Sequence, residues 1–266
     1  MTLSPALPAA RHAAGHPVNR VPKVTIDFWL IKLLAVTMGE TGADYLAVNM
    51  GLGLTTTSLI MTGVLVVALI LQFAQKRYVP WAYWLAVVLV SIVGTLLTDN
   101  LTDNFGVPLA TSTMAFTVLL GATFAAWYTA EGTLSIHEVF TTRREMFYWV
   151  AILLTFALGT AAGDLVAERF GFGYLVTGIL FAAVIGAIAL GYYVLRINAV
   201  LAFWLAYIFT RPLGASIGDL LSQPLEYGGL GLGTILTSTI FLVCIAGLVA
   251  YMTVTGSTED RQTGAA

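Results

Sequence analysis

The residues of this sequence best suited to chemistry are aspartates placed at a fixed distance from tryptophans. Each stands fifteen residues after a Trp and five residues after a Gly, in the pattern W-x9-G-x4-D. The four copies are Trp29, Gly39, Asp44; Trp84, Gly94, Asp99; Trp149, Gly159, Asp164; and Trp204, Gly214, Asp219. Carboxylate oxygens are ligands for hard cations and carriers of protons, so four recurring acids suggest ion or proton chemistry.

Other ionisable residues interrupt this repetition. Because each residue of an α-helix advances by about 100°, positions 7, 11 and 15 after a Trp share one face with it. Glu40 stands at position 11 of the first copy and Arg211 at position 7 of the fourth, while Lys32 follows Trp29 by three residues. Asp103 and Glu168 follow their aspartates by four residues, a spacing that makes helix neighbours. Duplication copies structural residues too, so departures from the pattern are the better sign of function.

We therefore expect Glu40, Asp44, Asp99, Asp164 and Asp219 to bind a cation or protons, with Arg211 and Lys32 as counter-charges. Asp103, Glu168 and the four tryptophans are accessory candidates. Structural alternatives remain open for several of them. The aspartates could cap a helix end, Arg211 could form a structural ion pair with one of them, and Lys32 could extend to the membrane surface. The tryptophans fit either an interfacial aromatic belt or packing at the inner mouth of the bundle.

The composition indicates an integral membrane protein. The 266 residues are 58% hydrophobic and only 10% charged, with a mean hydropathy of +0.88. A soluble domain carries about a quarter charged residues, so this chain lacks the polar surface that water requires. Eight apolar segments are long enough to cross a bilayer. We predict spans at about residues 24–48, 54–75, 80–101, 108–130, 146–167, 173–195, 199–221 and 232–254.

The repeat predicts the arrangement of these spans. The Trp-to-Trp spacings are 55, 65 and 55 residues, and both half-chain offsets are 120, which indicates a nested duplication. The halves are 24–130 and 146–254, and the repeats start near residues 24, 80, 146 and 199. Two crossings return the chain to the same side, so we predict an all-α bundle of four helical hairpins in parallel orientation.

The basic residues predict the orientation of the chain. Nine of the twelve Lys and Arg fall on the side of the N-terminus, which by the positive-inside rule places both termini in the cytoplasm. Residues 1–23 are expected to form a disordered cytoplasmic tail and residues 255–266 a second tail, flanking a single membrane domain at 24–254. The longer link between the halves is expected to form a short interfacial helix.

The fourfold motif resembles a family of uncharacterised bacterial inner-membrane proteins built from four tandem two-helix repeats, each with a Trp. The resemblance covers about residues 24–254 and implies eight spans in a bacterial inner membrane. It implies no substrate and no functional residues.

The sequence favours a transporter. There is no phosphate-binding glycine loop, HExxH, GxSxG or CxxCH motif, so we expect no enzyme activity, no cofactor and no nucleic-acid partner. We expect transport of a small cation, most plausibly a divalent metal ion exchanged for protons, in contact with the lipid bilayer. Two alternatives remain: transport of a small organic solute in an aromatic pocket, and a module that binds a partner subunit without transporting. The sequence does not indicate an oligomeric state.

Overall fold

The computed structural model describes residues 18–263, with side chains through residue 255, and this part of the chain contains helices but no strands. The first helices of the four repeats are α1 (Ile26–Asp44), α3 (Pro80–Asp99), α5 (Thr142–Asp164) and α7 (Ala199–Ser222). The second helices are α2 (Leu54–Phe73), α4 (Leu109–Glu131), α6 (Gly173–Tyr193) and α8 (Thr234–Thr263). Short π-helical turns follow three of the first helices: η1 (Tyr45–Asn49), η2 (Asn100–Asn104) and η4 (Leu165–Arg169).

The helix bounds agree closely with the predicted spans. Seven of the described helices are long and apolar enough to cross a membrane by length and composition, α1 being the exception. α1 does not meet this standard because its nineteen residues include four charged ones, Asp27, Lys32, Glu40 and Asp44. The link between the halves contains a single 3-10 turn, η3 (Ile136–Glu138), and α5 begins earlier than predicted, at Thr142.

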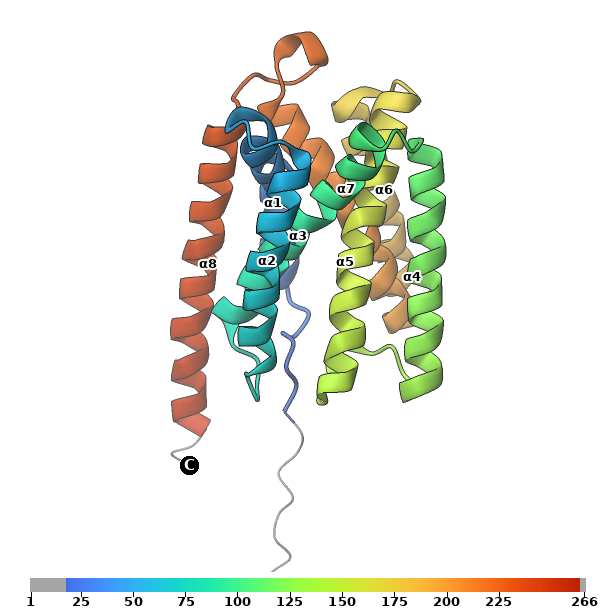
Figure 1. Cartoon of the computed structure of the whole chain (residues 1–266). Helices are drawn as coiled ribbons and strands as arrows, with labels where there is room; N and C mark the ends of the chain where they lie inside the picture. The colour runs from blue at the N-terminus through green and yellow to red at the C-terminus, as the bar shows by residue number, and fades with distance from the viewer. Residues whose placement is uncertain (1–17, 264–266) are drawn as a thin grey trace, which may run out of the picture.

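The four first helices form an inner ring. α1 packs against α3 and α7, and α5 packs against the same two helices on the opposite side (Figure 1). Each second helix covers the outside of the following repeat's first helix: α2 on α3, α4 on α5, α6 on α7, and α8 on α1. The two helices of one repeat therefore pack mainly on neighbouring repeats and not on each other. The repeats are interleaved instead, and α8 closes the ring.

The repeated glycines explain how the inner helices approach one another. At each contact the Gly of one helix meets the residue seven positions after the Trp of the next helix, where a Cβ would overlap it. The four contacts are Gly39 with Ser91, Gly94 with Phe156, Gly159 with Arg211, and Gly214 with Val36. Because small residues allow membrane helices to approach closely, one glycine per repeat closes the whole ring.

The outer surface of the bundle is apolar. Leu59 on α2, Met114 on α4 and Ile179 on α6 are between 61 and 72% exposed, and Val243 on α8 is 65% exposed. An apolar surface spread over four helices would be costly in water, and a bilayer removes that cost. The inner helices bury most of their side chains and leave the contact with the surroundings to the outer helices.

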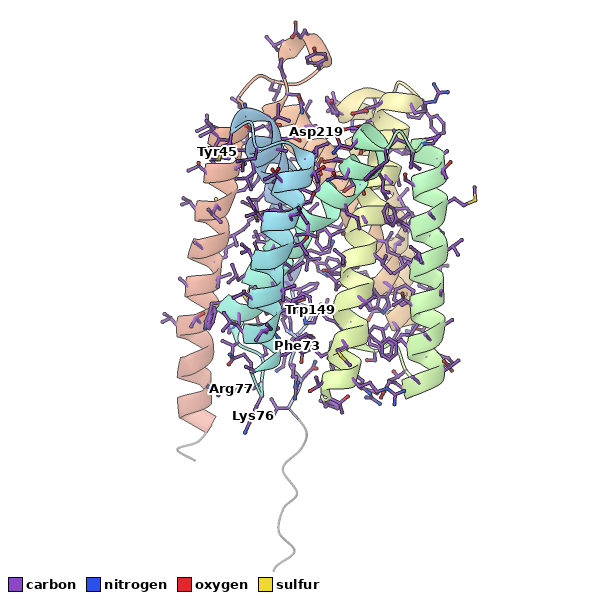
Figure 2. All side chains as sticks on the ribbon, in the orientation of Figure 1. Tyr45, Phe73, Lys76, Arg77, Trp149 and Asp219 are labelled. Atoms are coloured by element: carbon purple, nitrogen blue, oxygen red, sulfur yellow. The ribbon has the colours of Figure 1, made fainter. Side chains whose placement is uncertain are left out.

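We name the two ends of the bundle after the repeat residues. The Trp end carries the tryptophans and the Asp end the aspartates, as the labels of Trp149 and Asp219 show (Figure 2). The segment before α1 and the end of α8 both lie at the Trp end (Figure 1). The chain therefore begins and ends its described part on one side, as an even number of crossings requires.

Part of the predicted N-terminal tail is ordered at the Trp end. The backbone of Arg20 donates to the carbonyl of Val139, and the side chain of Asn19 donates to the carbonyl of Ile136. Arg20 also forms a salt bridge of 2.8 Å with Glu145, a fully buried side chain at the start of α5. Residues 19–20 are thus fixed across the end of the bundle, contrary to the expected disorder. The earlier part of the predicted tail, residues 1–17, lies outside the described residues.

The C-terminal boundary also differs from the prediction. The expected tail at residues 255–266 begins inside α8, which continues through Thr263.

We expect Gly94→Ala to lower the free energy of unfolding by about 1–3 kcal/mol, because the new Cβ would lie 2.6 Å from the Cβ of Phe156. The matched control is Gly63→Ala on α2, where no atom lies within 4 Å of the new Cβ. This control should be neutral or stabilising by up to about 1 kcal/mol, since Ala favours helix. Thermal unfolding in detergent measures both variants. Equal stability of the two would show that α3 and α5 do not approach as described.

Candidate functional site

Arg211 occupies the centre of the inner ring. Its side chain is 1% exposed, and its guanidinium forms a salt bridge of 2.8 Å with Glu40 of α1. The same nitrogen donates to the hydroxyl of Thr160 on α5 at 2.8 Å and to the hydroxyl of Thr95 on α3. One cation on α7 therefore contacts a side chain from each of the other three inner helices.

Backbone carbonyls complete the coordination of the guanidinium. Arg211 donates through Nη1 to the carbonyl of Val36 at 3.0 Å and through Nε to the carbonyl of Phe156 at 3.4 Å. The stem of Arg211 lies on Gly159, which leaves the space that the side chain needs. A buried charge requires this degree of hydrogen bonding, because each unsatisfied donor in an apolar interior costs free energy.

The repeat register explains why these side chains meet. Glu40, Thr95 and Thr160 all stand eleven residues after their Trp, so they form one layer around the axis. The fourth member of the layer, Ala215, lies on the same helix as Arg211, and its small side chain leaves the axis to the guanidinium. Two of the departures from repetition in the sequence, Glu40 and Arg211, thus meet in a single layer of the structure.

The four aspartates lie one turn nearer the Asp end. Asp219 is 8% exposed, and Asp44, Asp99 and Asp164 are half-buried. The charge of Glu40 acts on all four of them. Glu40 and the four aspartates therefore form one electrostatic cluster, to which each inner helix contributes.

These aspartates are not helix caps. Asp44, Asp99 and Asp164 each end an α-helix directly before a π turn, yet their side chains make no capping hydrogen bond. Gln223 donates to Asp44 at 3.1 Å, whereas no described residue donates to the carboxylates of Asp99, Asp164 or Asp219. The capping alternative is wrong for the first three, and their oxygens remain available to a ligand.

The π turns were missed by the sequence analysis, and they displace the accessory acids. π-helical bonds run from residue i to i+5, as between the nitrogen of Phe105 and the carbonyl of Asn100. Asp103 and Glu168 fall inside these turns and are exposed at the Asp end. The α-helical spacing therefore does not apply through this region, although the charge of Asp103 still acts on Asp99 and that of Glu168 on Asp164.

The acids are not assembled as a metal centre. Among the side chains that the structure describes, no group of three or more His, Cys, Asp or Glu is placed to hold a metal ion. The predicted ligand set of Glu40, Asp44, Asp99, Asp164 and Asp219 is therefore not closed in this conformation. The physical reason is that each aspartate belongs to a separate helix of the ring, while Glu40 is held by Arg211.

Comparison with known families identifies the repeat. A family model described as Repeat of Unknown Function (DUF347) matches residues 28–78, 82–133, 147–198 and 202–258. The chain belongs to the DUF347 family. Each matched segment of this chain contains an inner helix and an outer helix. No curated protein and no solved structure matches the chain.

Lys32 does not extend to the surface of this DUF347 protein, although this was one of the interpretations that the sequence allowed. Its side chain is fully buried. Its Nζ donates to the carbonyl of Tyr207 at 2.9 Å and lies 4.0 Å from the centre of the Tyr207 ring. Among the described residues it forms no ion pair, so it is not a counter-charge in direct contact with any carboxylate.

The tryptophans pack inside the bundle. Trp84, Trp149 and Trp204 are 1 to 4% exposed, which excludes an interfacial belt for these three. Trp29 is half-buried. The indole of Trp204 donates to the carbonyl of Leu134, and that of Trp84 to the hydroxyl of Tyr78. Packing at the mouth of the bundle, the alternative interpretation, describes them correctly.

Buried tyrosines are functional candidates that the sequence analysis missed. Tyr83 and Tyr148 are fully buried and joined by a hydrogen bond of 2.5 Å between their hydroxyls. Tyr207 is 1% exposed, and its hydroxyl has no partner among the described residues. A signal was present in the sequence, since an aromatic residue precedes every repeat Trp: Phe28, Tyr83, Tyr148 and Phe203.

A cavity of about 720 Å³ opens at the Trp end between α1, α6, α7 and the link before α5. Its lining is mainly apolar and includes Trp29, Phe203, Tyr192 and Ala206. None of the repeated acids contributes to it, so it is separate from the Glu40 cluster.

We expect Arg211→Met to lower the free energy of unfolding by about 3–5 kcal/mol, because it leaves Glu40 buried without its cation. The double variant Arg211→Met with Glu40→Met should recover a large part of this loss. The matched control is Arg169→Met, an exposed arginine at the Asp end. Thermal unfolding of the single and double variants in detergent gives the coupling. Additive effects of the two substitutions would contradict the ion pair.

Proposed function

We propose that this chain is a multi-pass protein of a bacterial inner membrane with the Trp end and both termini in the cytoplasm. The apolar outer helices support membrane insertion, and the distribution of basic residues supports the orientation. Lys76 and Arg77 belong to the link between α2 and α3 and lie at the Trp end (Figure 2). Arg143 and Arg144 belong to the start of α5, which lies at the same end (Figure 1). Arg169 stands alone among the described Lys and Arg residues at the Asp end.

The function that the site supports best is transport of a small cation. The observation that carries this proposal is the guanidinium of Arg211, which occupies an acidic interior on the axis of a four-helix ring. Arg211 satisfies Glu40 in the resting state. A cation that reaches Glu40 from the Asp end replaces Arg211, and the ring then changes conformation.

The positions of the acids suggest the route of the ion. The four aspartates attract cations to the Asp end, because clustered negative charge raises the local cation concentration. Glu40 lies one layer deeper. When Arg211 withdraws, the hydroxyls of Thr95 and Thr160 are released beside Glu40 and complete a set of oxygen ligands.

Proline provides a place where α7 can move. Pro212 directly follows Arg211 inside α7 and lacks the backbone donor that would bond to the preceding turn. Such a position bends more easily than an intact helix. Pro212 packs against Gly159 and Gly163 of α5, which have no side chains to block a shift of α7. Bending at Pro212 would carry Arg211 away from Glu40.

The ligand chemistry favours hard cations, and the specific form of the proposal is exchange of a divalent metal ion for protons. Oxygen ligands suit Mg²⁺ and Mn²⁺ as well as Na⁺. A divalent ion needs the carboxylates closer together than they are in the present conformation. Release of Arg211 frees Glu40 for the ion, and the charge of the incoming ion then draws the carboxylates together.

We expect Glu40→Gln and Asp99→Asn to lower cation uptake by roughly tenfold or more, as loss of a ligand or its support does in metal sites. Purified protein in liposomes is tested with Mn²⁺, Mg²⁺ and Na⁺, with and without a proton gradient. The matched control is Asp27→Asn, which removes an exposed acid at the opposite end of α1. Uptake at the wild-type rate by both site variants would exclude these residues from the ion path.

The cavity at the Trp end supports a second candidate function, transport of a small organic solute. Its volume and aromatic lining are typical of sites for apolar molecules. We expect Ala206→Phe to fill part of the cavity and weaken binding of a small apolar fluorophore, 1-aminoanthracene, detected by energy transfer from tryptophan. The matched control is Ala126→Phe on the exposed face of α4. Unchanged binding in Ala206→Phe would remove this candidate.

A further inference from the structure

Lys32 is a second buried cation in the inner ring, and its surroundings differ from those of Arg211. An ammonium group has three N–H donors, and the structure gives Nζ one hydrogen bond, to the carbonyl of Tyr207. The rest of its environment is aromatic, with Tyr207 at 4.0 Å and Phe156 at 5.7 Å from Nζ to the ring centres. Aromatic faces attract a cation but do not neutralise its charge.

No acid faces Lys32 from the helices that pack on α1. The charged residue of α3 is Asp99 at the far end, and α7 contributes Arg211 on the near side and Asp219 at the Asp end. α8 has no charged side chain between residues 234 and 255. On α1 itself, Asp27 is exposed, Glu40 is bound to Arg211 and Asp44 lies at the Asp end. The charged residues of α5, whose Phe156 lies beside Lys32, are at its two ends: Arg143, Arg144 and Glu145 at the start, with Glu145 bound to Arg20, and Asp164 at the Asp end. Arg211 acts on Lys32 as a like charge.

This environment allows Lys32 to change its protonation state without breaking an ion pair. Arg211 lacks that freedom, because a guanidinium stays protonated in proteins and this one is fixed by Glu40. Lys32 is also fully buried, and it does not line the cavity at the Trp end. A proton needs no cavity, whereas a metal ion or organic molecule at Lys32 would have to displace the packed rings.

Buried tyrosines lie beside Lys32 and beyond it toward the Trp end, and one hydrogen bond, between Tyr83 and Tyr148, joins two of their hydroxyls. Tyr207, whose ring covers Nζ, has a buried hydroxyl with no partner among the described residues, so this hydroxyl is free to turn. Tyr148 is hydrogen-bonded to Tyr83, and the ring of Tyr83 lies 5.7 Å from that of Tyr78. Tyr78 belongs to the link between α2 and α3, where burial raises its pKa to about 12, so it stays a neutral phenol. Neutral hydroxyls both accept and donate, which suits them to pass protons.

We propose that Lys32 is the proton-exchange site of the transporter and that the buried tyrosines toward the Trp end, Tyr207, Tyr148 and Tyr83, relay its protons. This inference rests on the proposed cation transport. In the release step an N–H bond of the ammonium breaks and its proton passes to a tyrosine hydroxyl oxygen, while that hydroxyl gives its own proton onward and the last proton passes to water at the Trp end, leaving Lys32 as a neutral amine. Uptake is the reverse, so no net charge remains on the tyrosines.

The protonation of Lys32 can be measured directly. The chain has three lysines, Lys23, Lys32 and Lys76, so lysine labelled with ¹⁵N at ζ gives three assignable signals. Loss of one signal in Lys32→Arg assigns the resonance. We expect the chemical shift of Lys32 to titrate within the pH range in which the protein stays folded. A Lys32 that keeps one protonation state throughout that range would overturn the inference, whatever the protein transports.

The number of protons moved per cation distinguishes proton exchange at Lys32 from a purely structural charge. Lys32→Arg keeps the positive charge but cannot release its proton, so we expect protons moved per cation to fall by about a hundredfold, the scale of a lost proton-transfer group. Lys76→Arg, an exposed lysine, is the matched control. Both are measured in liposomes with a pH-sensitive dye and a cation assay. Retained coupling in Lys32→Arg overturns the inference and leaves cation transport standing, whereas a wild type that moves no cation overturns the proposed function itself.

Discussion

The rest of this structure depends on the hydrogen bonding and charge balance of one cation in an apolar interior. A guanidinium at the centre of an apolar helical bundle is tolerated only if its donors find acceptors and its charge finds an anion. Arg211 meets both requirements by drawing on three neighbouring helices. This requirement fixes the rotation of each inner helix. It also places the four aspartates one turn beyond the guanidinium, toward the Asp end.

A symmetric scaffold and an asymmetric centre coexist because they use different positions of the same repeat. Glycines ten residues after each Trp close the ring in four similar contacts. At the nearby positions eleven and seven residues after the Trp, Glu40 and Arg211 replace residues that are small, hydroxyl-bearing or apolar in the other copies. Packing therefore follows the repeat, whereas the chemistry follows its exceptions. Lys32 and Tyr207 are likewise exceptions to the repeat, and they lie in the next layer toward the Trp end.

The sequence predicted the helices, the repeat and the residues of the central layer, because these depend on local hydrophobicity and helical spacing. It did not predict that Arg211 would pair with Glu40 instead of an aspartate, because that depends on which helices adjoin across the ring. The depth of Lys32 was missed for the same reason, since its neighbours come from α5 and α7. The π turns after Asp44, Asp99 and Asp164 have no clear signal in a single sequence. The interleaving of the outer helices is likewise a property of the assembled ring.

The interleaved ring has a consequence for how such a chain could have arisen. Because every outer helix covers the next repeat, a chain of two repeats leaves one inner helix uncovered and closes the ring only as a pair of identical copies. In such a pair, any residue at the position of Arg211 occurs twice around the axis, and two guanidinium groups would compete for one centre. Joining the halves in a single polypeptide removes this duplication. Glu40 from the first half and Arg211 from the second can then form a lone ion pair, which a homodimer with twofold symmetry has no means to encode.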